Sequence, residues 1–153
     1  MKGYKVVGVL VTLVQLGSIV GFGLSLHTMA GVVIGTISGG EMGFEMNVEA
    51  IGGPGFMELS LSPQNPGFLE ATATFEIMIL DDLGALLDSD YETVTLKSGE
   101  SQQVELRLDI SAADIMRIVE GMETTVKVTI GLRTLYDLVS ITNTIELEVG
   151  ETI

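Results

Sequence analysis

The chain has 153 residues, of which 46% are apolar, and a formal net charge of −14 at pH 7. This length and composition suit a single globular domain with one core, and they exclude an intrinsically disordered chain. Cysteine is absent and the few lysines and arginines form no cluster, which excludes disulfides, thiolate zinc sites and nucleic-acid binding.

The first element is an apolar segment, Val6–Leu26, which has no charged residue and follows Lys2 and Lys5. About 20 apolar residues wound as a helix can cross the roughly 30 Å hydrocarbon layer of a bilayer. We therefore predict that residues 1–27 form a membrane anchor and that residues 28–153 form the globular domain.

The orientation of this single pass follows from its flanking charges. No basic residue occurs between Lys5 and Lys97, so the positive-inside rule places the N-terminus in the cytoplasm and the C-terminal domain outside it. All 21 acidic residues lie at Glu41 or later. An anionic membrane surface would repel a domain of this charge.

Two other uses of the apolar segment stay open. A cleaved signal peptide needs a small-residue processing site, and Thr28-Met29-Ala30 offers one, although the apolar core is longer than the usual 7–15 residues. The segment could also be an assembly strand that completes the sheet of another subunit.

Gly17 and Gly21 lie four residues apart inside the apolar segment. Small residues at this spacing let two membrane helices approach closely, so these glycines are candidates for helix packing. Three more glycines repeat the spacing beyond the segment. There, glycine and the β-branched residues of Met29–Ile37 favour a strand or a connector.

The rest of the chain consists of short alternating segments separated by turns rich in glycine, proline and aspartate. Such alternation is typical of half-buried antiparallel strands, and one helix is predicted from a cap at Ser111 to Gly121. The fold class is therefore mainly β: an immunoglobulin- or fibronectin-like antiparallel β-sandwich with one short helix, behind an N-terminal transmembrane helix. The predicted strands are Met42–Ala50, Phe56–Ser62, Phe68–Leu80, Tyr91–Leu96, Gln103–Leu108, Thr124–Ile130 and Ser140–Val149.

Asp88, Asp90 and Glu92 alternate in the densest acidic part of the chain, which we interpret as a turn. Alternating oxygen ligands are what calcium-binding loops use, so these three residues are candidate calcium ligands. The segment lacks the central glycine and the distal glutamate of an EF-hand loop. A solvated turn is therefore the simpler interpretation, and no other cofactor is predicted.

No catalytic residues are predicted. A serine–histidine–aspartate relay would have to use His27, the only histidine, at the edge of the membrane. No phosphate-binding glycine loop or dinucleotide fingerprint is present, and nothing singles out two carboxylates for glycoside hydrolysis. The sequence therefore predicts a protein that is not an enzyme.

The motif Asn65-Pro66-Gly67, followed by a long strand, a turn with glycine and two further strands, resembles the water-stress and hypersensitive-response domain of group-two late-embryogenesis-abundant proteins. The resemblance covers roughly Glu45–Glu148, and members of that family often carry an N-terminal membrane helix. It implies a fibronectin-like sandwich with a protective or interaction function and no catalytic residues. The glycine-rich first half and the acidity depart from the family's pattern.

A second resemblance is to subunits of archaeal surface filaments, which are cysteine-free sandwiches with an apolar N-terminus. It implies that Val6–Leu26 packs with copies of itself or serves as a donor strand. The sequence thus predicts partners at the membrane: other envelope proteins, reached through protein–protein contact, or copies of the chain in a self-assembling filament. The first hypothesis gives the chain a structural, protective or envelope-complex role, and the second makes it a subunit of a self-assembling filament.

Overall fold

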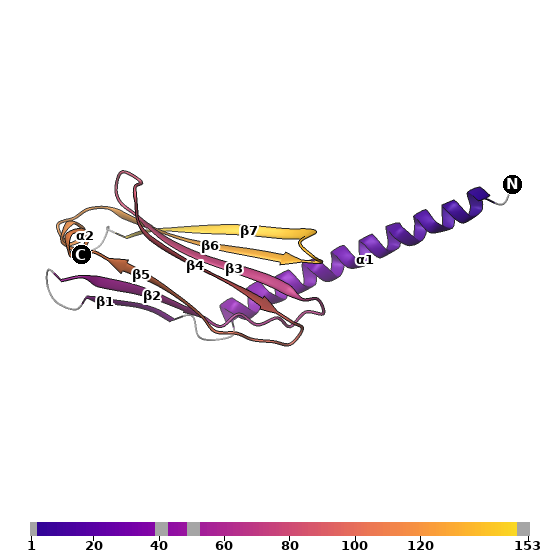
Figure 1. Cartoon of the computed structure of the whole chain (residues 1–153), viewed down its shortest axis with the longest axis horizontal. Helices are drawn as coiled ribbons and strands as arrows, with labels where there is room; N and C mark the ends of the chain where they lie inside the picture. The colour runs from indigo at the N-terminus through magenta and orange to yellow at the C-terminus, as the bar shows by residue number, and fades with distance from the viewer. Residues whose placement is uncertain (1–2, 39–42, 49–52, 150–153) are drawn as a thin grey trace.

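The computed structural model describes residues 3–38, 43–48 and 53–149, and it consists of one long helix that runs into two antiparallel sheets (Figure 1). The predicted fold class is confirmed, since the chain is a mainly β sandwich with an N-terminal apolar helix and one short helix. The elements are α1 (Gly3–Ser38), β1 (Gly43–Val48), β2 (Gly55–Leu61), β3 (Ala71–Leu80), β4 (Leu86–Leu96), β5 (Val104–Ile110), α2 (Ala112–Val119), β6 (Thr124–Thr134) and β7 (Val139–Val149).

The sheets differ in size. One has the strand order β1-β2-β5 and the other the order β4-β3-β6-β7, and all neighbouring strands are antiparallel. The chain changes sheet three times, between β2 and β3, between β4 and β5, and between β5 and β6. β4 and β5 each stand at the end of a strand order and are edge strands of opposite sheets, and they lie side by side.

β3 supplies the centre of the core, because its five inward side chains are each at most 1% exposed. Burial alternates along β3, and likewise along β2 and β5, as expected for the half-buried strands that the alternation in the sequence predicts. Replacing Phe75, which is fully buried, with alanine would cost about 3–5 kcal/mol. The inward residues of the three strands are Ala71, Ala73, Phe75, Ile77, Ile79, Met57, Leu59, Leu61, Val104, Leu106, Leu108 and Ile110.

The prediction of a strand or connector over Met29–Ile37 is wrong, because α1 continues without a break to Ser38. A stripe of α1 side chains packs on the sandwich, and this packing outweighs the low helix propensity of glycine and β-branched residues. The predicted border between residues 27 and 28 lies inside this helix. The buried residues of the stripe are Ser25, Thr28, Met29, Val32 and Thr36.

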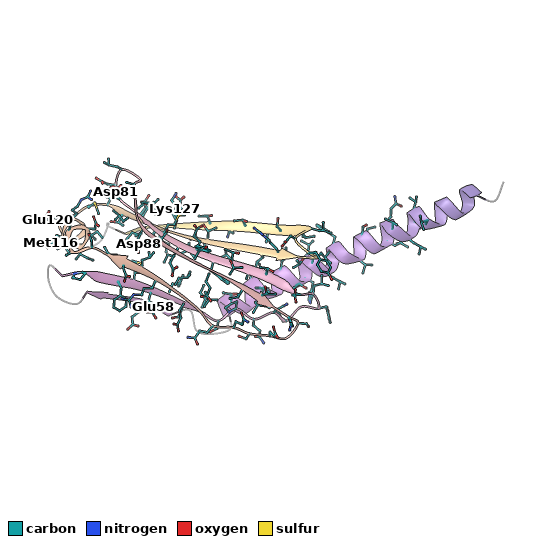
Figure 2. All side chains as sticks on the ribbon, viewed as in Figure 1. Glu58, Asp81, Asp88, Met116, Glu120 and Lys127 are labelled. Carbon is teal, nitrogen blue, oxygen red and sulfur yellow. The ribbon has the colours of Figure 1, made fainter. Side chains whose placement is uncertain are left out.

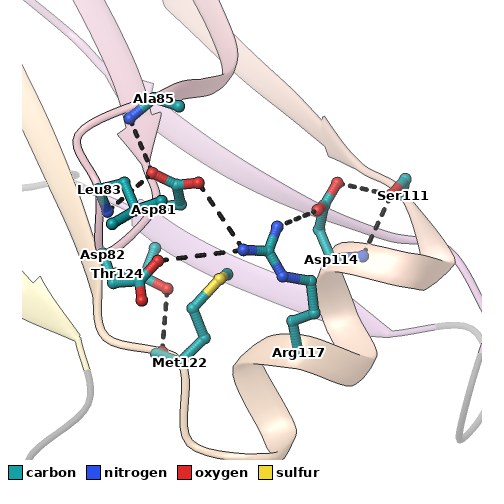
Figure 3. A network of polar contacts seen from close by, with 9 residues as sticks. All are labelled: Asp81, Asp82, Leu83, Ala85, Ser111, Asp114, Arg117, Met122 and Thr124. Atoms are coloured by element: carbon teal, nitrogen blue, oxygen red, sulfur yellow. Dashed lines mark hydrogen bonds and ion pairs between the residues drawn. The ribbon is translucent and has the colours of Figure 1, made fainter.

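α2 closes the end of the sandwich opposite the N-terminus (Figure 1). The predicted cap is confirmed: the Ser111 hydroxyl accepts the N–H of Asp114 at 3.2 Å. Arg117 lies between Asp114, at 3.4 Å, and two carboxylates of the β3–β4 turn, Asp81 at 3.8 Å and Asp82 at 3.9 Å (Figure 3). These contacts tie the helix to the neighbouring turn.

Candidate functional site

The N-terminal half of α1 is apolar on all sides and lies outside the sandwich (Figure 1). All described side chains from residue 10 to residue 20 are exposed. α1 includes one segment, Leu10–Thr36, that is long and apolar enough to cross a membrane, and only 6% of its most apolar stretch is buried by the rest of the chain. A helix that is apolar all round needs a cover of lipid or of other protein.

The two candidate glycines for helix packing differ in their surroundings. A Cβ on Gly17 would meet open space, whereas one on Gly21 would lie 3.5 Å from Cδ1 of Leu135 in the β6–β7 turn. Gly17 is therefore open to a neighbouring helix, and Gly21 is the point at which the sandwich first reaches α1. Packing between two copies of α1 through these glycines stays a prediction.

The C-terminal part of α1 rests on the loop of residues 63–67, which we call the docking loop. A Cβ on Gly31 would lie 2.7 Å from Cγ of Pro66, and one on Gly35 would lie 2.9 Å from the backbone oxygen of Gln64. A Cβ on Gly67 would collide with Thr28. Glycine is needed where the helix and the loop come this close, so the four-residue spacing marks a contact with the chain's own loop.

Asn65 holds the docking loop in place. Its side chain is fully buried, and its Nδ2 donates to the backbone oxygens of Leu69 at 2.8 Å and Leu96 at 2.9 Å. Its Oδ1 accepts the N–H of Gly67 at 2.9 Å. Because every polar atom of this buried amide has a partner, the Asn-Pro motif has a structural role here.

The acidic side chains Asp88, Asp90 and Glu92, which we call the carboxylate row, lie on β4. The prediction of a turn is wrong at Asp88 and Asp90, because β4 runs unbroken from Leu86 to Leu96; Glu92 lies within the predicted strand Tyr91–Leu96. Each carboxylate accepts a backbone N–H from the edge of β5, at positions that alternate along that strand. The pairs and their distances are Asp88–Asp109 at 2.7 Å, Asp90–Arg107 at 2.9 Å and Glu92–Glu105 at 3.3 Å.

The carboxylate row has a clear structural task. β4 and β5 end their sheets, and an edge strand offers unpaired N–H groups to any passing chain. The row satisfies three of these groups and joins the two sheets along one side. Among the described residues, no group of three or more histidine, aspartate or glutamate side chains is arranged to hold a metal ion. Calcium binding by the row stays an untested alternative to this structural role.

The opposite side of the sandwich is open. β7 is the last strand of the four-stranded sheet, and its inward residues Ile141, Ile145 and Leu147 are 54%, 49% and 53% exposed. Their partners across the ladder on β6 include the buried Leu132 and Val126, so these residues share the core face. The smaller sheet leaves this part of the face uncovered. The alternation over Ser140–Val149 could have identified these inward residues of β7. Their exposure, however, depends on how many strands each sheet has.

A groove of about 480 Å³ continues this surface toward α1. It is lined by Phe22, Leu26 and Val33 of the helix and by Val139 and Ile141 of β7. The lining is almost wholly apolar, which suits contact with another apolar surface better than chemistry. We call the groove and the inward residues of β7 the open face.

The chain matches no known protein family and no curated protein. The resemblances to the water-stress domain and to archaeal filament subunits therefore stay predictions. Several solved structures are similar to this chain at low sequence identity and with TM-scores below 0.5.

One of these structures is a glycosyl hydrolase family 2 member from Bacteroides cellulosilyticus DSM 14838, with 18% identity and a TM-score of 0.48 over 71% of this chain and 14% of that one. Another is a putative beta-galactosidase from Bacteroides fragilis, with 12% identity and a TM-score of 0.49 over 70% and 15% of the two chains. A protein from Archaeoglobus fulgidus has 15% identity and a TM-score of 0.46 over 74% of this chain and 97% of its own. The chain thus spans only a small part of the two hydrolases.

Proposed function

We propose that this chain is a membrane-anchored β-sandwich, displayed outside the cytoplasm, that acts through contact with other proteins and catalyses no reaction. The exposed N-terminal half of α1 supports this proposal most strongly. Eight large apolar side chains from Leu10 to Phe22 are 48–68% exposed. Covering each contributes about 1 kcal/mol or more, so lipid stabilises the helix by an amount on the order of 10 kcal/mol.

The location outside the cytoplasm rests on charge. Lys2 and Lys5 precede the apolar segment, and the acidic residues all follow it. The positive-inside rule then keeps the N-terminus in the cytoplasm.

The open face is the proposed contact surface. Exposed apolar residues that continue a core face are well suited to an apolar strand or helix of a partner. β7 adds an edge to which a partner strand could hydrogen-bond. A partner that covered Ile141, Ile145 and Leu147 would extend the core of the sandwich.

A filament is the second candidate function. The same exposed helix could be covered by α1 of neighbouring copies, and the open space at Gly17 allows such close packing. In that arrangement the open face would receive a segment of the next subunit.

Membrane extraction and protease treatment of cells that express the full chain test the proposal. We expect the protein to stay in the membrane pellet at alkaline pH, and its domain to be digested by protease added to intact cells. The double variant Leu13→Lys, Leu16→Lys should be released, while Leu83→Lys, an exposed site on the β3–β4 turn, should behave like the unmodified chain. A domain protected in intact cells would overturn the topology. Sheared, detergent-resistant fibres made of this chain would favour the filament.

A further inference from the structure

The β6–β7 turn (residues 135–138) presents apolar side chains to the outside. Tyr136 is 100% exposed and Leu138 is 82% exposed. Three consecutive residues of the turn, Leu135, Tyr136 and Asp137, have φ values of 51°, 54° and 66°, which costs roughly 1 kcal/mol or more for each such residue. Packing within the sandwich does not explain why a strained turn exposes a tyrosine and a leucine.

The height of this turn along α1 is fixed by the contact between Leu135 and Gly21. Gly21 lies five residues before the end of the apolar segment at Leu26, or roughly 8 Å along the helix axis at 1.5 Å per residue. The apolar helix from Val6 to Val20 is about 22 Å long by the same rise. The two lengths together match the roughly 30 Å hydrocarbon layer, so the sandwich first meets α1 within roughly 8 Å of the edge of that layer.

The side chains at this height have the chemistry of a membrane interface. Tyrosine places an apolar ring and a polar hydroxyl at the boundary between lipid and water. Roughly 9 Å further along the helix axis by the same rise, Phe68, which is 72% exposed, stacks on His27 with ring centroids 5.8 Å apart. The single carboxylate of the turn, Asp137, can stay hydrated among lipid headgroups.

Several carboxylates of the sandwich lie away from this position. Asp81 and Glu120 lie at the end of the sandwich away from the exposed half of α1 (Figure 2). Asp82 and Asp114, both in contact with Arg117, belong to the same end. Nearer the β6–β7 turn, the exposed carboxylates Glu70 and Asp137 line one hollow together with the exposed Arg133, so a cationic side chain accompanies the acidic ones there.

We propose that the β6–β7 turn is a second membrane contact, in which Tyr136 and Leu138 enter the headgroup region of the bilayer that α1 spans. This inference rests on the proposed membrane anchor and adds a binding surface whose partner is lipid. Two attachment points, the helix and the turn, then fix the sandwich against the membrane.

Single-tryptophan variants of the full chain test the inference, because the natural sequence has no tryptophan. Tyr136→Trp and Leu138→Trp report on the turn, Leu13→Trp reports on the span, and Leu83→Trp, at a site that is 86% exposed on the β3–β4 turn, is the matched control. Each variant is reconstituted into phosphatidylcholine vesicles whose acyl chains carry bromine at a shallow or a deep position. The fluorescence lost to each lipid gives the depth of the indole.

We expect the tryptophans at positions 136 and 138 to lose fluorescence mainly to shallow bromines and to emit at shorter wavelength than the control. The tryptophan at position 13 should be quenched most by deep bromines, and the one at position 83 by neither. If positions 136 and 138 behave like position 83 while position 13 is quenched, the turn is not a membrane contact although the anchor stands. If position 13 is not quenched, the anchor and the inference are both overturned.

Discussion

Replacing Asp90 with alanine tests the carboxylate row. The change removes the acceptor for the N–H of Arg107, which lies 2.9 Å from Oδ2. A hydrogen bond to a charged acceptor contributes about 1.5–3 kcal/mol, and partial exposure to water favours the lower end. We expect Asp90→Ala to lower the unfolding free energy by about 1.5 kcal/mol, measured by urea denaturation of the full chain in detergent micelles and followed by circular dichroism.

Two control variants show whether the hydrogen bond is the cause. Asp90→Asn keeps an acceptor oxygen but loses the charge, so it should cost about half as much. Ser89→Ala changes the neighbouring side chain, which is exposed on the other face of β4, and should cost no more than about 0.5 kcal/mol. Equal losses for Asp90→Ala and Asp90→Asn, or no loss for either, would refute the role given to the row.

Calcium, close packing, the buried amide and the open face give the remaining predictions. Millimolar calcium should leave the unfolding midpoint unchanged, since the carboxylate row already accepts N–H groups; a rise that is lost in Asp88→Asn would instead establish the site. Gly67→Ala should cost about 1–3 kcal/mol through its collision with α1, whereas Gly17→Ala, in open space, should show no loss in the same thermal melt. Asn65→Ala should cost about 3 kcal/mol in urea denaturation, because it strands buried backbone groups. Ile145→Lys should leave the unfolding free energy within about 1 kcal/mol but abolish chemical cross-links to partners in membranes; cross-linking at the original yield would exclude the open face.

The period-two alternation predicted most of the sandwich, because burial of one sheet face is a local signal. The predicted strands Phe56–Ser62 and Phe68–Leu80 contain almost all of β2 and all of β3, and Gln103–Leu108 contains most of β5. The helical continuation of α1 was missed, since the glycines of Met29–Ile37 favour a helix only once the docking loop packs on them. That contact joins residues more than 30 positions apart, such as Thr28 and Gly67, and no local pattern carries it.

The structural role of the carboxylate row could not be predicted for a related reason. Alternating aspartates suggest a solvated turn when they are considered alone, and their partners are backbone N–H groups of another strand. Only the position of β4 beside β5 allows these carboxylates to accept the N–H groups. The open face likewise depends on the unequal number of strands in the two sheets, which the sequence of β7 does not encode.

The unbroken passage of α1 into the sandwich has a mechanical consequence. Without a flexible linker between the apolar half of the helix and the docking loop, the domain cannot tumble independently; in the proposed membrane setting it rotates and tilts together with the helix. A partner diffusing in the same membrane then meets the open face at a constant height and in few orientations. Because the membrane already restricts the orientation of both proteins, association costs less orientational entropy. Even a modest apolar contact can then hold the two proteins together.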